Sequence, residues 1–185
     1  MMSGASIMRR CSLGTLALVL LFGTSAQSAP EIAPNGFLVK LDVSINAPAG
    51  KVYEALVGQV GSWWNPEHTY SHDAKNLSMD ARPGGCFCEK LPNGSGIEHL
   101  RVVYVAPPQV VRFSGALGPL QASGVAGSMT WKLTGAADST RLDLSYSIGG
   151  FIPGGFEKIA PAVEAMLREQ FDRLKLFVET GKPTH

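Results

Sequence analysis

The feature that most constrains this chain is the order of its hydrophobic periodicities. Apolar and polar residues alternate over 37–45, which predicts a half-buried strand. From residue 49 the apolar residues have helical spacing, which predicts two short helices. Six short strand-like segments then lie between residues 74 and 148, separated by Gly, Pro and Asn turns that make neighbouring strands antiparallel. The chain ends in one long amphipathic helix, predicted over 161–179.

Few compact folds accommodate one strand, two short helices, six antiparallel strands and one long helix in that order. We expect an α+β domain over residues 36–180, in which a seven-stranded curved antiparallel sheet wraps around the C-terminal helix. A sheet and a helix curve differently, so a gap between them is the natural place for a ligand cavity.

The residues before this domain have the three-part pattern of a secretory signal. A basic pair at positions 9 and 10 precedes an apolar run over 13–22, and small residues follow that permit cleavage after Ala26 or Ser28. The apolar run is too short for a stable membrane anchor. The pattern predicts a signal peptide over 1–26 and a periplasmic or secreted protein. The alternative is a hydrophobic N-terminal helix of the fold.

The charge of the chain argues against nucleic acid as a partner. The sequence has 16 Lys and Arg against 15 Asp and Glu, and removing the two arginines of the signal segment leaves 14 basic residues against the same 15 acidic ones. Phosphate binding needs clustered basic residues, and no basic stripe is visible.

Two of the three cysteines, Cys86 and Cys88, lie in the predicted domain. In a regular strand, side chains two residues apart point to the same face about 7 Å apart, which is too far for an unstrained disulfide. We therefore expect no disulfide between them, and strand parity directs both outward.

Four segments carry a resemblance to a known family: Ser62-Trp63-Trp64 and residues 82–89, 102–108 and 139–146. The chain is similar to the START-like, or SRPBCC, helix-grip superfamily, in the branch of the activator of heat-shock ATPase homologues and the bacterial polyketide cyclase/dehydrase-like proteins. The resemblance implies a domain that encloses a small hydrophobic ligand, with enzymes such as aromatase/cyclases as a minority use. Chaperone activation is not expected, because an exported protein has no access to a cytosolic chaperone.

Three polar residues are predicted to point into the domain together. If the hairpin turns at Gly94, Glu89 faces His99 and Phe87 faces Arg101 on one side of the sheet. The same parity directs Leu100 and Val102 outward and Val103 and Val105 inward.

This polar cluster, formed by Glu89, His99 and Arg101, has three interpretations. It is a structural ion-pair network, or Arg101 and His99 bind a carboxylate or carbonyl of an otherwise apolar ligand, or Glu89 or His99 acts as a general acid or base.

The remaining candidate ligand-binding residues are large apolar or aromatic side chains on the inward faces of the elements. The segment Trp64–Tyr70 is predicted to form a lid over the cavity mouth, opposite a loop at 117–121 whose Leu117 and Leu120 look exposed. The predicted wall consists of Trp63, Trp64, Tyr70, Phe87, Phe113, Met129, Trp131, Tyr146 and Met166.

No cofactor or metal site is predicted. His68, His72 and Asp73 have ligand-type side chains, but they lie in an irregular loop without a clear further ligand. The Gly-rich segment 149–155 lacks the spacing of phosphate-binding or dinucleotide-binding loops.

The prediction is therefore an exported binder or carrier of a small hydrophobic molecule with one polar end. The alternatives are a cyclase- or isomerase-like enzyme that uses the same cavity, and a protein-interaction module that uses the loop at 117–121.

Overall fold

The computed structural model describes Met1 and residues 29–184 as a single α+β domain. The predicted signal peptide over 1–26 lies outside the described residues, apart from Met1. None of the described helices is long and apolar enough to cross a membrane.

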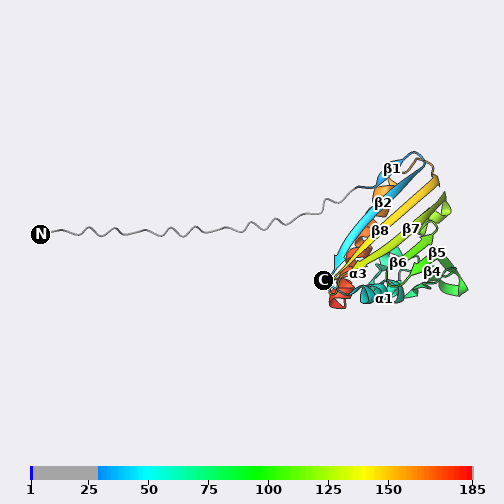
Figure 1. Ribbon diagram of the computed structural model, residues 1–185. Helices are drawn as coiled ribbons and strands as arrows, with labels where there is room; N and C mark the ends of the chain where they lie inside the picture. Colours follow the sequence, from blue (N-terminus) through cyan, green and yellow to red (C-terminus); the bar gives the residue numbers. More distant parts are fainter. Residues whose placement is uncertain (2–28, 185) are drawn as a thin grey trace.

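Eight antiparallel strands form one sheet in the order β1-β2-β8-β7-β6-β5-β4-β3 (Figure 1). Each strand from β4 to β8 pairs with its predecessor in the chain, because only short turns join them. The strands are β1 (Glu31–Ala33), β2 (Gly36–Ile45), β3 (Leu77–Met79), β4 (Cys86–Lys90), β5 (Gly96–Ala106), β6 (Val110–Ser114), β7 (Gly124–Gly135) and β8 (Thr140–Phe151).

The predicted α+β architecture is confirmed, with one strand more than expected. The additional strand is β1, whose three residues pair with the start of β2 across a turn at Asn35. All three β1 residues are exposed, so the segment has no alternation of apolar and polar residues by which it could be predicted.

Three α-helices and four short 3₁₀ turns complete the domain. The helices are α1 (Ala49–Gly58), α2 (Val60–Trp63) and α3 (Ile159–Thr180), and the 3₁₀ turns are η1 (Pro66–His68), η2 (Ala74–Asn76), η3 (Pro92–Gly94) and η4 (Gly118–Ala122).

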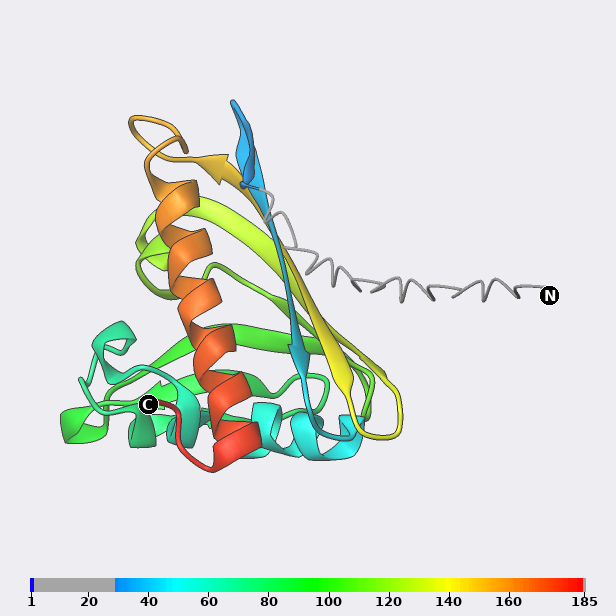
Figure 2. The same ribbon diagram turned by 90° about the vertical axis from the view of Figure 1, so that its left-hand side faces the viewer.

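The long helix α3, orange to red in Figure 2, crosses one face of the curved sheet. Its 22 residues span about 33 Å at 1.5 Å per residue. Pro161 lies in its first turn, where a missing N–H costs no helical hydrogen bond, and Gly181 ends it with the left-handed φ of 80°.

The middle of the sheet packs directly on this helix. The ring of Trp131 on β7 lies 6.5 Å from Phe171 on α3 and 5.0 Å from Phe113 on β6. The indole of Trp63 is also buried, and its Nε1 donates to Ala55 O at 2.9 Å. Arg173 on α3 donates to Trp63 O at 2.9 Å, which fixes α2 against the long helix. Trp63, Phe113 and Trp131 are each at most 1% exposed, so large side chains fill this part of the core.

Cys86 and Cys88 form a disulfide, so the prediction of two unpaired cysteines is wrong. The strand pairing is irregular at this point, because a register shift lies between Phe87 and Cys88, where β5 has one extra residue. The two Cα atoms are 5.4 Å apart, closer than the spacing of about 7 Å on which the prediction rested. At that separation a disulfide can close, so β4 is not a regular strand between the two cysteines.

Candidate ligand cavity

An apolar cavity of about 550 Å³ opens where the sheet and α3 diverge. Its walls are the first two turns of α3, the segment Trp64–Tyr70, the 3₁₀ turn η4 with the residues beside it, and inward side chains of β3, β4 and β5. The cavity is therefore bounded by both the sheet and the C-terminal helix, but it lies at the β3–β5 side of the sheet and not over its middle.

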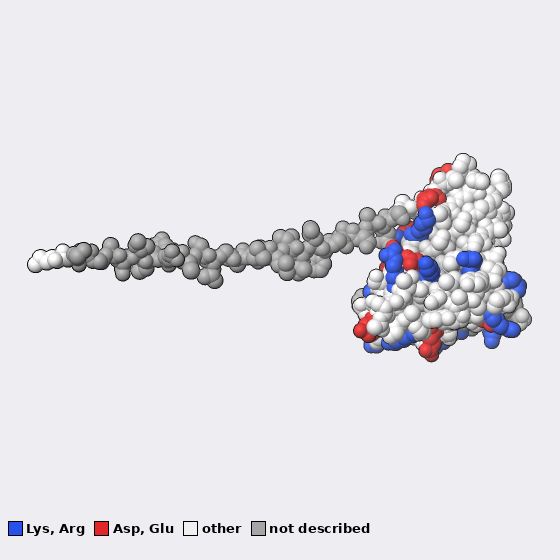
Figure 3. Space-filling view, viewed as in Figure 1, with Lys and Arg blue, Asp and Glu red and all other residues white. Residues whose placement is uncertain are grey.

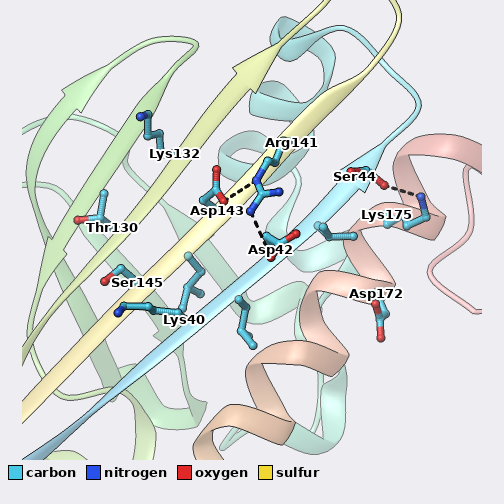
Figure 4. Close-up of a pocket in the computed structure, with 13 residues that line it drawn as sticks. Lys40, Asp42, Ser44, Thr130, Lys132, Arg141, Asp143, Ser145, Asp172 and Lys175 are labelled. Atoms are coloured by element: carbon cyan, nitrogen blue, oxygen red, sulfur yellow. Dashed lines mark hydrogen bonds and ion pairs between the residues drawn. The ribbon is translucent and has the colours of Figure 1, made fainter. Parts of the chain in front are cut away.

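A second hollow, of about 820 Å³, lies on the outer side of the domain along β2 and β8 (Figure 4). Arg141 in this groove binds Asp143 at 2.8 Å and Asp42 at 3.3 Å, and Lys175 donates to Ser44 O at 2.5 Å. Because most of the residues that line this groove are charged or polar, it suits an apolar ligand poorly, whereas the cavity at β3–β5 suits one well.

The polar wall of the cavity comes from the β4–β5 hairpin. Glu89 and His99 both point inward, with side chains 0% and 5% exposed, and His99 Nε2 lies 3.0 Å from Glu89 Oε2. The predicted meeting of these two residues inside the domain is present in the structure. We call this pair the Glu89–His99 dyad.

The register of the hairpin differs from the predicted one. Glu89 is opposite Ile97, Phe87 is opposite Leu100, and His99 is the extra residue of a β-bulge. His99 and Leu100 are therefore both buried, and residues 101–103 face the side opposite to the predicted one. A second register shift between Val102 and Tyr104 returns Val105 to the predicted inward side. Leu100 and Val102 are buried, and Val103 is exposed.

Arg101 is excluded from the cavity by the same bulge. Its side chain is 53% exposed, binds the carboxylate of Glu98 and donates to Gly84 O at 3.1 Å. The prediction that Arg101 points inward beside the dyad is wrong, because the extra residue in β5 reverses its direction.

Glu89 is a fully partnered carboxylate. Besides its contact with His99, it accepts the backbone N–H of Tyr70 at 3.1 Å and of Ser71 at 2.6 Å. Burial alone would raise the pKa of Glu89, but the hydrogen bonds from Ser71, Tyr70 and His99 together outweigh that effect and lower its pKa. Glu89 is ionised at neutral pH and holds the Tyr70–Ser71 segment against the sheet.

His99 is a buried, neutral imidazole. Burial lowers its pKa, and the neighbouring Glu89 opposes this only in part. An ionised carboxylate only accepts hydrogen bonds, so Nε2 carries the ring proton and Nδ1 has a free lone pair. Among the residues that the structure describes, Nδ1 of His99 is buried and has no hydrogen-bond partner. The ring lines the cavity, with the Phe87 ring 5.2 Å away.

The two predicted mouth segments do line one cavity. Trp64 Nε1 donates to His68 O at 3.1 Å, and His68 contacts Glu169 of α3 at 2.9 Å, so the first segment is attached to the long helix. In the second, Leu117 and Leu120 are each only 6% exposed. The expectation that these leucines are exposed is wrong, because both side chains turn into the core.

The twelve predicted site residues fall into four groups. Arg101 is exposed, and Glu89 lies behind His99. Five line the cavity, namely Trp64, Tyr70, Phe87, His99 and Met166. The others are core residues away from it, namely Trp63, Phe113, Met129, Trp131 and Tyr146. Tyr146 still supports the rim, because its hydroxyl accepts the Leu117 N–H at 2.8 Å.

Several lining residues were not predicted. Ile159 and Val163 lie one turn apart on α3 and continue to the predicted Met166. Their helical spacing indicates a face turned to the domain, but not which part of that face the sheet leaves uncovered. Thr69 belongs to the segment that was predicted to cover the mouth, whereas Leu77, Ser123 and Lys158 give no sequence signal for a cavity, because tertiary packing brings them there.

His68, His72 and Asp73 do not converge on a common point for a metal. Within the described residues, no three His, Cys, Asp or Glu side chains form a group that could hold a metal ion.

Comparison with known proteins gives matches among solved structures. No family model matches the chain, and no curated protein does. DynU16, encoded in the dynemicin biosynthetic locus, is 26% identical to this chain, with a TM-score of 0.56. The match covers 79% of this chain but only 48% of DynU16, so this chain spans about half the length of that protein. CalU16 of Micromonospora echinospora is 16% identical over 83% of this chain and 84% of its own, with a TM-score of 0.54.

A third match is Aha1 of Colwellia psychrerythraea, an activator of Hsp90 ATPase, solved as a dimer. It is 18% identical over 78% of this chain and 98% of its own, with a TM-score of 0.57. These neighbours have SRPBCC, polyketide cyclase-like folds. The chain has the START-like helix-grip fold. The helix-grip fold accounts for the position of the cavity, since the long helix covers one face of a sheet that curves away from it.

Proposed function

We propose that this helix-grip protein is an exported binder or carrier of a small hydrophobic molecule with one polar end. The observation that supports it best is the cavity of about 550 Å³, whose wall is mostly apolar and includes His99, the buried imidazole that contacts Glu89. Ligand pockets in proteins typically combine such a wall with a few convergent polar groups.

Export and a periplasmic or secreted location rest on the sequence pattern of residues 1–26. The Cys86–Cys88 disulfide fits this proposal, because disulfides persist in oxidising compartments. Acidic and basic side chains are interspersed on the face shown in Figure 3, which favours a small-molecule partner over nucleic acid.

Binding of an apolar fluorescent probe, phenylnaphthylamine, tests the proposal. We expect saturable one-site binding with increased emission. In the variant Val163→Trp, an indole added on the cavity-facing side of α3 fills part of the space, and the affinity falls at least tenfold. The matched control is Ala165→Trp, which adds the same group to an exposed position of α3 outside the cavity wall.

The control variant is expected to bind the probe like the unmodified protein. Equal binding by both tryptophan variants, or no saturable binding by the unmodified protein, would contradict a ligand site in this cavity. Circular dichroism spectra of the variants verify that both are folded.

The Glu89–His99 dyad also favours a second candidate, a cyclase- or isomerase-like enzyme. A carboxylate that fixes the tautomer of a neutral histidine, with the other ring nitrogen unprotonated, is an arrangement suited to a general base. Turnover of a bound ligand separates the two candidates. A carrier returns its ligand unchanged, and an enzyme converts it.

A further inference from the structure

We infer that the polar end of the ligand is a neutral hydrogen-bond donor, a hydroxyl or an N–H group, that is accepted by Nδ1 of His99. This inference rests on the proposed function and specifies its ligand class. It replaces the carboxylate or carbonyl that Arg101 and His99 were predicted to bind.

The first support is the hydrogen-bonding state of the imidazole. Glu89 Oε2, 3.0 Å from His99 Nε2, needs a donor, so the ring proton lies on Nε2. Nδ1 is then an acceptor, and it is buried with no partner in the described part of the chain. A buried acceptor without a partner carries a desolvation cost that a donor on the ligand would remove. A carbonyl oxygen has no proton to offer to it.

The second support is that the position of Glu89 is fixed. Its two oxygens are held by the backbone N–H groups of Tyr70 and Ser71 at 3.1 and 2.6 Å. The bulged residue is held as well, because Gln121 Nε2 donates to His99 O at 3.2 Å. The imidazole is therefore held in one tautomer and in one place beside the cavity, which is the preorganisation that selective recognition needs. Nδ1 itself is covered by neighbouring protein atoms, which must move aside when a ligand donates to it.

The third support is the charge of the inner wall. Glu89 brings a buried negative charge to this end of the cavity, and Arg101, the cation predicted beside it, points to solvent. The one Lys or Arg in the cavity wall is Lys158, which is exposed at the start of α3. An anionic ligand group placed against His99 would meet the Glu89 carboxylate without a compensating cation, and it would be repelled.

Three probes that share a naphthalene ring and differ in their polar group test this directly: naphthol, methoxynaphthalene and naphthoate. Naphthol offers a donor, methoxynaphthalene has the same oxygen without its proton, and naphthoate is an anion. Dissociation constants at neutral pH can be measured from quenching of tryptophan fluorescence, since Trp64 lines the cavity. We expect naphthol to bind about tenfold more tightly than methoxynaphthalene, and naphthoate to bind most weakly.

Two variants assign the preference to Nδ1. In His99→Phe the acceptor is lost and the apolar surface is kept, so naphthol and methoxynaphthalene should bind equally. The matched control is Arg101→Ala on the same strand, which should keep the preference because Arg101 points out of the cavity. If His99→Phe does not fold, nitrogen NMR of the unmodified protein replaces it: the Nδ1 resonance of His99 shifts on addition of naphthol and not of methoxynaphthalene.

The outcomes separate this inference from the proposed function. If all three probes bind but naphthol has no advantage, or if naphthoate binds most tightly, the inference is wrong and the proposed binding of hydrophobic molecules stands. If neither these probes nor phenylnaphthylamine binds, both are wrong. A preference that Arg101→Ala abolishes and His99→Phe retains would also overturn the assignment to His99.

Discussion

At the scale of single residues, the dyad links ligand recognition to the ionisation states of two buried groups. Glu89 is buried as a carboxylate because three hydrogen bonds offset its desolvation, and His99 is buried as a neutral ring. Each group therefore has a pKa below its ordinary value in the folded protein. Protonation of either one opposes the native arrangement.

The free energy of unfolding should therefore fall on mild acidification. Because both pKa values are lower in the folded than in the unfolded chain, the unfolded chain binds more protons, and stability is lost as the pH falls. For His99 the loss begins near pH 6.5, and for Glu89 near pH 4.3, which are about the ordinary values of these side chains. The slope for each proton is at most about 1.4 kcal/mol per pH unit.

Urea unfolding at a series of pH values measures this profile. In the variant His99→Phe, the part of the loss that begins near pH 6.5 should disappear, and the part at lower pH should remain. Identical profiles for the variant and the unmodified protein would contradict a neutral buried His99.

At the scale of secondary structure elements, the bulge in the β4–β5 hairpin decides which residues reach the cavity. The alternation of apolar residues predicted the strands, and it correctly directed Glu89 and His99 inward. It could not reveal that His99 and Leu100 share a face, because a bulge inserts one residue without changing the composition of the strand. All errors from Arg101 to Val103 follow from this one residue.

The disulfide is part of the same distortion. Cys86 and Cys88 lie on either side of Phe87, where the register shifts opposite His99. Reducing the disulfide should lower the free energy of unfolding by about 1–2 kcal/mol, the chain-entropy value for so small a loop. It should also weaken the preference for naphthol over methoxynaphthalene, because the disulfide no longer restrains the part of β4 that precedes Glu89 and lies opposite the bulge at His99.

Urea unfolding and probe titration with and without a reductant measure both effects. The double variant Cys86→Ser, Cys88→Ser serves as the control and should be insensitive to the reductant. If reduction leaves both the stability and the probe preference of the unmodified protein unchanged, the disulfide has no part in shaping the site.

At the scale of the whole molecule, the order of elements was sufficient to predict the helix-grip architecture. One strand, two short helices, six strands and a long helix leave little freedom in how a sheet covers α3. The position of the cavity was predicted only as a gap between sheet and helix. Which half of the sheet stays uncovered depends on packing, since Trp131 and Phe113 fill the middle while β3–β5 and two loops surround empty space.

This division between a packed half and an open half is the basis of the proposed function. Residues such as Trp131 and Tyr146 look like pocket residues in the sequence, because an apolar inward residue has the same pattern in a core and in a cavity wall. The loop residues that close the cavity, such as Ser123, have no periodic pattern.

The measurement that tests the central claim most directly is native mass spectrometry of the full protein purified from the cells that produce it. The proposed function predicts a protein with one bound small hydrophobic molecule, and a markedly reduced amount of it on the Val163→Trp variant. The further inference predicts that this molecule carries a hydroxyl or N–H group. A mass without ligand, from a protein that also fails to bind phenylnaphthylamine, would contradict the claim that this cavity holds a hydrophobic ligand.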